Sequence, residues 1–300
     1  SVASRGLGDV YKRQRKMRTT IFTILCLVSF IGFSQIKTPQ PSPSSELEQM
    51  VGLTEIGVQY NRPSKRGRVI FGDLVPFGKI WRTGANSSTK ISFSTDVEIN
   101  GNKIKEGTYS IFSIPDKTYW DVILYSDAEL WAVPRDWDDK KIVFKSNYKV
   151  HKINSGNELE TFTISINNVT NNYADLYIGW DDTYVKIRID VPSRQMVDSS
   201  IESVMNESPK ASDYYAAAVY YRQENIKLDI ALKWINKAME MTEDPQFFQL
   251  RQQSLIMAAN GDYKDAIEVA KKSLKLSIEA DNQDYVKMNN ESIDEWSKKF

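Results

Sequence analysis

Hydrophobic and polar residues alternate with a period of two through the first half of the chain, from about residue 46 to 192. Within Thr54–Tyr60, for example, Ile56, Val58 and Tyr60 fall on one face of an extended strand. This period is typical of strands with one buried face. It predicts further strands at Ile91–Phe93, Val97–Ile99, Lys103–Ile104, Thr108–Ile114, Trp120–Tyr125, Lys141–Phe144, Leu159–Ile166, Ala174–Trp180 and Tyr184–Ile189.

Turn residues separate these strands, and no helical pattern interrupts them. Asn100-Gly101 lies between two short apolar runs, which strongly indicates a β-hairpin because a type I′ turn needs positive φ at both central residues. Turns recur roughly every 8–12 residues, a spacing typical of all-β domains. The sequence therefore predicts an antiparallel β-sandwich or barrel-like domain over residues 46–192.

Beyond Pro192 apolar residues recur three and four positions apart, as on one face of an α-helix. Ser199–Glu202 fits a capping box, in which a serine and a glutamate satisfy each other's backbone N–H groups at a helix start. Asp244-Pro245 predicts another helix start. Asn260-Gly261 predicts a helix end, with Asp262 capping the helix that follows.

Two of these helical segments repeat each other. Residues 231–238 match residues 266–273 with a shift of 35, and small residues recur where paired helices would approach closely. The segment Gly261–Ile267 resembles a degenerate tetratricopeptide repeat. We expect roughly two helix pairs and a terminal helix near Tyr285–Lys299. The predicted fold class is therefore α+β multidomain, with an α-helical repeat domain over residues 198–300.

The N-terminal residues predict export. From Met17 the chain combines a basic start with the apolar run Ile21–Phe33 and small residues before a cleavage point after Ser34. As a helix this run would span about 20 Å, against a hydrocarbon core of about 30 Å, so we expect a cleaved signal peptide over residues 17–34. Residues 1–16 resemble translated sequencing adaptor and are interpreted as a non-native extension. Residues 35–45 form a Pro/Ser-rich spacer.

Composition narrows the chemistry further. The only cysteine, Cys26, lies inside the predicted signal peptide, so the mature chain would hold no disulfide and no thiolate site. Only one of the 39 acidic residues but six of the 39 basic ones precede residue 35, which leaves a mildly acidic mature chain. We therefore expect no nucleic-acid partner, no cofactor and no membrane span after signal cleavage. His151, the sole histidine, stands between Lys149 and Lys152 in an exposed strand, which disfavours zinc hydrolase and Ser-His-Asp schemes.

The segment from Asn61 to Asn86 is the most distinctive part of the chain. It combines arginines and aromatic residues with glycines and prolines that fix a particular backbone path. Arginine supplies forked donors that suit carboxylates, phosphates and sugar hydroxyls. From these residues we select one candidate ligand-binding set: Arg62, Arg66, Arg68, Trp81, Arg82 and Asn86. No catalytic and no metal-binding residue is predicted.

Several segments carry a family resemblance. Tyr60–Ser64, Gly67–Gly72, Leu74–Asn86, Gly107–Phe112 and Glu160–Ile164 resemble the family called domain of unknown function 2911, over about residues 41–190. The resemblance implies an exported β domain, in the periplasm or outer envelope of a Gram-negative bacterium, that is often followed by helical repeats. It implies no activity. The chain departs from the family pattern around residues 132–148.

Two interpretations of the arginine set stay open. The arginines form a preorganised pocket for an anionic or polyhydroxy ligand, or each one pins a loop through backbone carbonyls or acidic residues. For Arg82 we expect a side chain that is at least partly buried and held by a carboxylate, with Glu160 and Asp73 as the candidates. Trp81 is expected in the core.

Trp131 and Trp137 flank an acidic run of Asp136, Asp138 and Asp139. Exposed tryptophans stack on sugar rings and paired carboxylates hydrolyse glycosides, but we favour the alternative of one core and one loop tryptophan beside a solvated charge cluster. The favoured function is an exported, non-enzymatic binding module, with a small anionic or glycan ligand on the β domain and a protein partner on the helical repeats. The alternatives are a carbohydrate-active hydrolase using Asp/Glu chemistry, or a purely structural module.

The export hypothesis predicts a defined mature N-terminus. We expect the chain expressed from Met17 to appear in a periplasmic fraction and to begin at Gln35, because cleavage follows small residues. Intact-mass spectrometry of the exported protein measures this. An exported protein that retains Met17 would contradict the prediction.

Overall fold

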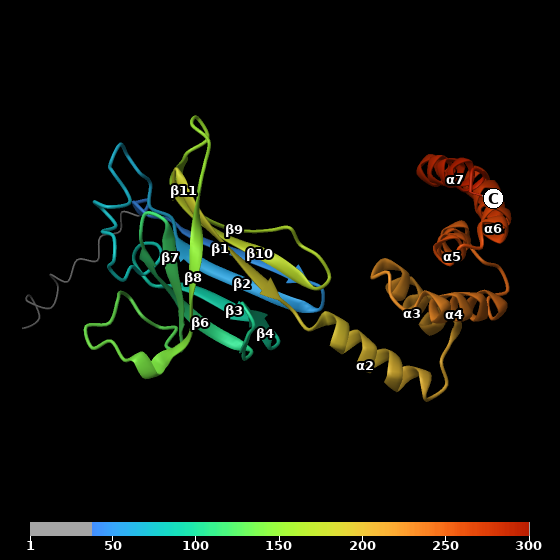
Figure 1. The fold of residues 1–300 in the computed structure, drawn as a ribbon, viewed down its shortest axis with the longest axis horizontal. Coiled ribbons are helices and arrows are strands. Elements are labelled where there is room, and N and C mark those ends of the chain that lie inside the picture. Colours follow the sequence, from blue (N-terminus) through green and yellow to red (C-terminus); the bar gives the residue numbers. More distant parts are fainter. Residues whose placement is uncertain (1–37, 300) are drawn as a thin grey trace, which may run out of the picture.

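A computed structural model describes residues 38–299 of the chain. They form a β-barrel followed by six helices, which confirms the predicted fold class (Figure 1). The predicted extension, the signal peptide and the first residues of the spacer lie outside the described residues. No helix in the described part of the chain is long and apolar enough to cross a membrane.

Every strand pairing in the barrel is antiparallel. The main sheet runs in the order β1-β2-β3-β6-β7-β8-β11-β10-β9, with the β4–β5 hairpin attached to β11. The strands are β1 (Ser44–Val51), β2 (Thr54–Asn61), β3 (Thr89–Phe93), β4 (Val97–Ile99), β5 (Asn102–Ile104), β6 (Gly107–Pro115), β7 (Tyr119–Tyr125), β8 (Ile142–Lys152), β9 (Leu159–Asn167), β10 (Tyr173–Asp181) and β11 (Thr183–Asp190).

The predicted alternation of apolar and polar residues correctly identifies which side chains face the core of the barrel. Ile56, Val58 and Tyr60 of β2 are all buried, as expected, while the residues between them are more exposed. The predicted hairpin also forms, with φ of 53° at Asn100 and 78° at Gly101. The periodic pattern did not predict β1, which begins inside the predicted spacer and alternates only between exposed and partly buried residues.

The barrel closes through the chain that follows β2. β1 and β9 stand at the two ends of the sheet order. Beyond β2, the N–H of Lys65 donates to the Glu160 carbonyl at 2.6 Å, and the N–H of Phe162 donates to the Pro63 carbonyl at 2.9 Å. These hydrogen bonds join residues 63–65 to β9, so the segment that opens the arginine-rich loop is itself the seam of the barrel.

The six helices are α2 (Ser193–Met205), α3 (Ala211–Gln223), α4 (Leu228–Glu240), α5 (Phe247–Ala259), α6 (Tyr263–Glu279) and α7 (Gln283–Trp296). Two predicted starts were wrong. Ser199–Glu202 lies inside α2, which begins directly after Pro192 because β11 ends at Asp190. α5 begins two residues beyond Asp244-Pro245, because Gln246 and Gln249 form the capping box instead. The predicted boundary at Asn260-Gly261 is confirmed.

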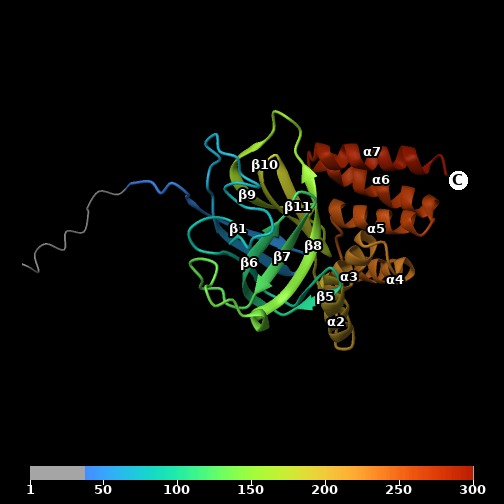
Figure 2. The ribbon, with the colours of Figure 1, turned by 60° about the vertical axis from the view of Figure 1, so that its left-hand side comes forward.

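The internal repeat has a structural counterpart in burial. On α4, Ala231, Ile235 and Ala238 have no exposed surface, and neither do the residues 35 positions later on α6, Ala266, Ala270 and Ser273. α4 packs against α3, and α6 packs against α5 and α7. Small residues therefore recur where the helices are closest, in two helix pairs that stack beside each other (Figure 2). Their assignment as tetratricopeptide repeats stays a prediction.

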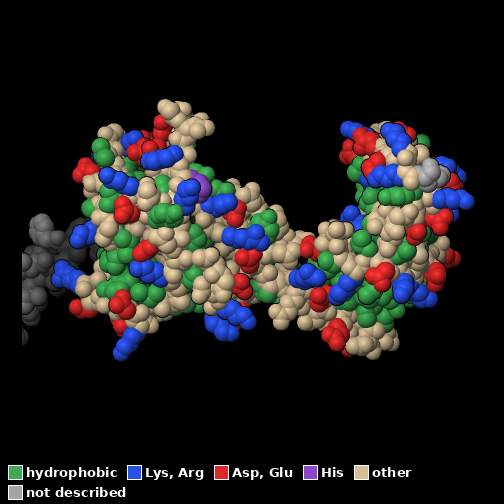
Figure 3. Space-filling model, viewed as in Figure 1, with side chains coloured by type: hydrophobic (Ala, Val, Ile, Leu, Met, Phe, Trp, Pro, Cys, Tyr) green, Lys and Arg blue, Asp and Glu red, His purple; other side chains and the backbone are tan. Residues whose placement is uncertain are grey.

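The junction between barrel and helices is short and specific. The Ser193 hydroxyl at the start of α2 accepts a hydrogen bond from the N–H of Leu53, in the turn between β1 and β2. Gly52 in this turn has φ of +55°, and a Cβ there would lie 1.9 Å from the Ser193 hydroxyl oxygen. Further along, the Asn171 and Asn172 amides donate to the Glu224 carboxylate beyond α3. Figure 3 shows a broad hollow between the barrel and the helices.

Asp198 fastens α2 to the helices that follow. Its carboxylate accepts hydrogen bonds from the Tyr221 hydroxyl of α3 and from the Lys227 ammonium, both at 3.1 Å. Burial alone would raise the pKa of Asp198, but these hydrogen bonds outweigh burial and hold the pKa below its ordinary value. The carboxylate is therefore stabilised as the anion in the folded state.

Because folding lowers this pKa, Asp198 contributes stability above the ordinary aspartate range, near pH 4, and loses it as the pH falls below that range. We expect Asp198→Asn to lower the Tm near neutral pH and to make the Tm fall less steeply between about pH 6 and pH 3. Thermal melts across this range measure both effects. The matched control is Asp136→Asn, which removes an exposed carboxylate; a D198N protein with the wild-type pH dependence would contradict the prediction.

Candidate functional site

The loop between β2 and β3, residues 62–88, is held against the barrel at fixed points. The N–H of Trp81 donates to the Ser113 carbonyl of β6 at 2.7 Å, and the N–H of Ser113 donates back at 2.9 Å. Gly84 has φ of +145°, and a Cβ there would lie 3.1 Å from the Thr89 hydroxyl and 3.2 Å from the Asn61 carbonyl. The loop therefore follows a path that only glycine permits at this point.

Trp81, expected in the core, is partly buried and anchors the loop by packing its indole ring against the core. The ring stacks on Trp180 with a centroid distance of 6.3 Å and meets Phe162 edge-on at 5.2 Å. It also meets Phe71 and Trp120 edge-on, each at 6.2 Å. Its N–H donates to the Gly84 carbonyl at 3.0 Å, which closes the turn that follows. Such aromatic pairs stabilise by about 0.5–1.5 kcal/mol each beyond their buried area.

A cavity of about 470 Å³ opens between this loop and the segment that precedes β1. Four cationic residues line it, Arg66, Arg68, Lys79 and Arg82, and no acidic residue stands among the described lining. The other lining residues are mostly apolar or aromatic: Pro41, Ser42, Pro63, Ser64, Leu74, Val75, Pro76, Ile80, Trp81, Gly84, Ala85, Val133 and Trp180. Its volume lies within the range of small-molecule sites, about 300–1,000 Å³.

The prediction that a carboxylate holds Arg82 was wrong. The residue is partly buried, as expected, but its side chain forms no hydrogen bond or ion pair within residues 38–299. The Glu160 carboxylate instead accepts a hydrogen bond from the backbone N–H of Arg66, at 2.8 Å. Asp73, the other candidate, lies exposed on the loop. Arg82 is therefore a cation on the cavity wall without a counter-charge in the described structure.

The remaining arginines bind backbone or hydroxyl oxygens. Arg62 donates to the Phe162 carbonyl at 3.1 Å and to the Thr163 hydroxyl at 2.9 Å. These hydrogen bonds join the loop to β9 at the barrel seam, and Arg62 does not line the cavity. Arg68 donates to the carbonyls of Ser64 and Lys65, while Arg66 donates to the Pro41 carbonyl at 3.3 Å. Arg62 is therefore held as the loop-pinning interpretation expects, whereas the Arg82 side chain lines the cavity without such a partner in the described structure.

The last predicted site residue, Asn86, lies in an adjacent hollow of about 630 Å³. Its amide donates to the Ser42 carbonyl at 3.3 Å, so it helps hold the segment that separates the two spaces. Trp131, whose side chain is among the most exposed apolar ones at 73%, also lines this hollow together with several amide side chains. Sequence reasoning did not select Lys79 as a site residue, because nothing in the neighbouring sequence distinguishes it from a solvent-exposed lysine.

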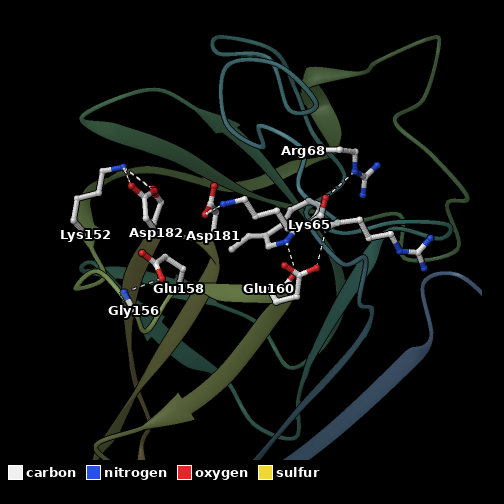
Figure 4. A network of polar contacts seen from close by, with 11 residues as sticks. Lys65, Arg68, Lys152, Gly156, Glu158, Glu160, Asp181 and Asp182 are labelled. Atoms are coloured by element: carbon white, nitrogen blue, oxygen red, sulfur yellow. Dashed lines mark hydrogen bonds and ion pairs between the residues drawn. The ribbon is translucent and has the colours of Figure 1, made fainter.

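A separate hollow on the other side of the seam carries the acidic residues. Lys65 bridges to Asp181 at 2.5 Å, and Glu158, Glu160 and Asp182 complete the lining (Figure 4). Burial would raise the pKa of Asp182, but hydrogen bonds from Lys152 and Thr183 outweigh burial and hold the pKa below its ordinary value. An acid catalyst needs a raised pKa instead. No group of three or more potential metal ligands occurs in the described part of the chain.

The other sequence candidates lie in structural surroundings. Trp137, in the loop after β7, packs edge-on against Phe112 of β6 at 5.2 Å, and its indole N–H donates to Asp139 at 2.9 Å. Trp137 is therefore packed and Trp131 is exposed, which agrees with the expectation of one core and one loop tryptophan. His151 stacks on Tyr184 at 5.1 Å, on the surface of β8 and β11.

Comparison with known proteins bears on the barrel. Residues 42–189 match the family model described as protein of unknown function (DUF2911). The β-barrel is a DUF2911 domain. The match spans the barrel and the whole arginine-rich loop, and it ends before α2. No curated protein and no solved structure matches the chain.

The two kinds of arginine should respond differently to substitution in this DUF2911 barrel. We expect Arg62→Lys to lower the free energy of unfolding by about 1–3 kcal/mol, because an ammonium cannot reproduce the forked pair of hydrogen bonds to β9. Arg82→Lys should leave it nearly unchanged, because Arg82 has no partner in residues 38–299 to lose. Urea unfolding of both variants measures this, and an Arg82→Lys variant as destabilised as Arg62→Lys would contradict it.

Proposed function

We propose that this chain is an exported envelope protein whose barrel binds a small anionic ligand without catalysis, and whose helices bind a protein partner. The observation that carries the ligand proposal is the cavity that Arg66, Arg68, Lys79 and Arg82 line, with no carboxylate among its described lining residues. Cationic side chains in a cavity attract anions strongly, because the low-dielectric walls focus the field.

The way the arginines are held supports this proposal. Arg66 and Arg68 donate to carbonyl oxygens, which fix a guanidinium without cancelling its charge. Arg82 keeps its donors available for a ligand within the described structure. A carboxylate, phosphate or sulfonate would receive paired charge-assisted hydrogen bonds from such a group. The apolar wall, which includes Leu74 and Ile80, suits a ligand with a hydrocarbon or ring body.

Trp131 favours a sugar acid among such ligands. Its exposed ring stands in the adjacent hollow beside Gln59, Asn61 and Asn86, and amide side chains and tryptophan faces are common partners of sugar hydroxyls and rings. A ligand with its carboxylate at Arg82 could extend past the Pro41–Pro43 segment towards this hollow. An anionic saccharide is therefore the ligand class that we favour.

The remaining parts of the proposal rest on different observations. Export rests on the basic and apolar N-terminal residues of the sequence. The protein partner rests on the stacked helix pairs, since such arrays present extended surfaces. The hydrolase alternative has no positive support in the acidic hollow, where Lys65 and Lys152 pair with Asp181 and Asp182. A structural role describes Arg62 but gives no reason for an unpaired Arg82.

The ligand proposal predicts charge-dependent binding of a fluorescent probe, anilinonaphthalene sulfonate, which combines a sulfonate with apolar rings. We expect the full chain to bind it, and Arg82→Gln to weaken binding about tenfold, because a charge-assisted hydrogen bond contributes about 1.5–3 kcal/mol. Galacturonate should displace the probe, whereas galactose, which lacks the carboxylate, should not. Fluorescence titration measures all three.

Two controls make this experiment decisive. Arg135→Gln removes the same charge from an exposed position that lines none of the described cavities, so binding should stay at the wild-type level. The neutral probe N-phenylnaphthylamine, which keeps the rings but not the sulfonate, should bind far more weakly. Equal binding by wild type and Arg82→Gln, or equal displacement by galactose and galacturonate, would refute the proposed site.

A further inference from the structure

A short segment of chain separates the cationic cavity from the adjacent hollow. It comprises residues 38–43, which directly precede β1, and is called the strap below. Pro41 and Ser42 line the cationic cavity, whereas Gln40 and Pro43 line the other hollow. The strap is therefore a shared wall between two spaces of about 470 and 630 Å³.

The strap is held firmly at one end only. At that end the N–H of Arg62 donates to the Pro43 carbonyl at 2.9 Å, which continues the pairing of β1 with β2. The carbonyls of residues 41 and 42 accept longer hydrogen bonds, at 3.3–3.4 Å, from the side chains of Asn61, Arg66 and Asn86. These lengths exceed the usual range of about 2.7–3.2 Å. Every side chain of the strap except Ser42 is exposed, so little buried surface opposes its displacement.

The side chains that hold the strap also line the two hollows. Arg66 lines the cationic cavity, and Asn61 and Asn86 line the other hollow. The strap offers these donors carbonyl oxygens, and its three prolines carry no N–H of their own. The carboxylate and hydroxyl oxygens of a saccharide accept the same kind of hydrogen bond. A saccharide can therefore replace the strap at the same donors without leaving them unpaired.

The two hollows differ in charge, and this difference sets the direction of a ligand that crosses the strap. The cationic cavity has no carboxylate among its described lining residues. In the other hollow the charged residues of the described lining, Lys90 and Glu129, pair with each other at 2.7 Å. The rest of that lining includes amide and hydroxyl side chains and the exposed ring of Trp131. The first space suits an acidic group, and the second suits an uncharged sugar ring.

We propose that the strap is a displaceable gate, and that its displacement joins the two hollows into one groove for an oligosaccharide with a single acidic end. The acid binds at Arg66 and Arg82, the neutral units occupy the former position of the strap, and Trp131 stacks on the last ring. A single sugar acid needs only the cationic cavity, so the gate acts on longer ligands alone. This inference rests on the proposed function, because it places the acid at the same anion site.

Two chains that differ only in the strap test the proposal. One begins at Thr38 and keeps the strap, and the other begins at Pro43, which retains the hydrogen bond from Arg62. The ligands are maltotrionate, which joins two glucose units to a gluconate, and gluconate alone. By isothermal titration calorimetry we expect the chain from Pro43 to bind maltotrionate about tenfold more tightly, because a site that is open only part of the time loses affinity in proportion. Gluconate should bind both chains equally.

The full chain provides a version of this experiment that removes no residue. Pro39→Gly combined with Pro41→Gly leaves the strap in place but raises the entropy of its displaced state. We expect this variant to bind maltotrionate more tightly than the unsubstituted full chain does, by a smaller factor than the truncation, and to bind gluconate equally. Thermal melts of all four proteins check that each one is folded.

Matched substitutions separate the two ends of the groove. In the chain from Pro43, Trp131→Ala should remove the gain for maltotrionate and leave gluconate binding unchanged. Tyr119→Ala, which removes another exposed ring from the barrel, should change neither. Maltotriose, which lacks the carboxylate, should bind every chain far more weakly than maltotrionate.

The outcomes distinguish the gate from the anion site. Equal affinity for maltotrionate with and without the strap, while gluconate still binds, would overturn the gate and leave the proposed function intact. An equal gain for gluconate and maltotrionate on removal of the strap would show that the strap only covers the cavity, and it would also overturn the gate. Absence of gluconate binding in every chain would refute the proposed function and this inference together.

Discussion

The packing of one indole ring, that of Trp81, positions the arginine-rich loop and the cationic side chains that it carries. Its contacts with Trp120, Phe162 and Trp180 link the loop after β2 to β7, β9 and β10 at once. A loop of this length would otherwise move freely, because ordering it costs roughly 1–2 kcal/mol of backbone entropy per residue. Aromatic packing offsets part of that cost, and the backbone pairing of Trp81 with Ser113 fixes the loop in register with the sheet. The cationic wall is therefore a consequence of how the core is packed.

A second constraint is that the arginine side chains are held in place without their positive charge being neutralised. A carboxylate that holds a guanidinium also cancels its charge, whereas a backbone carbonyl holds it and leaves most of the field intact. Arg68 follows this rule with the carbonyls of Ser64 and Lys65. The acids nearby, Glu160 and Asp181, are engaged by the Arg66 backbone N–H and by Lys65, on the opposite side of the seam. The barrel thus separates its charges into two adjacent hollows of opposite sign.

Sequence reasoning recovered what depends on local pattern and missed what depends on long-range pairing. Alternation gave most of the strands, and Asn100-Gly101 gave its turn, because both are properties of a few consecutive residues. β1 was missed because its partly buried face includes the polar residues Ser45 and Gln49, so its burial alternates but its hydrophobicity does not. The first residue of α2, Ser193, accepts a hydrogen bond from Leu53, 140 residues earlier, and no local capping motif can indicate such a contact. The arginines were found by composition, but their partners depend on where β9 and the residues before β1 come to lie.

The short segment before β1 has a practical consequence. Hydrogen bonds from the Arg62 N–H, the Arg66 side chain and the Asn86 side chain reach the carbonyls of residues 41–43, so this segment is strapped across the rim between the two hollows. Any tag or surface linkage attached just upstream therefore emerges beside the mouth of the cationic cavity, where its bulk would shadow a ligand. A linkage beyond α7 leaves from the far side of the helices (Figure 1). Immobilisation and affinity capture will report on the open cavity only when the chain is tethered by that second end.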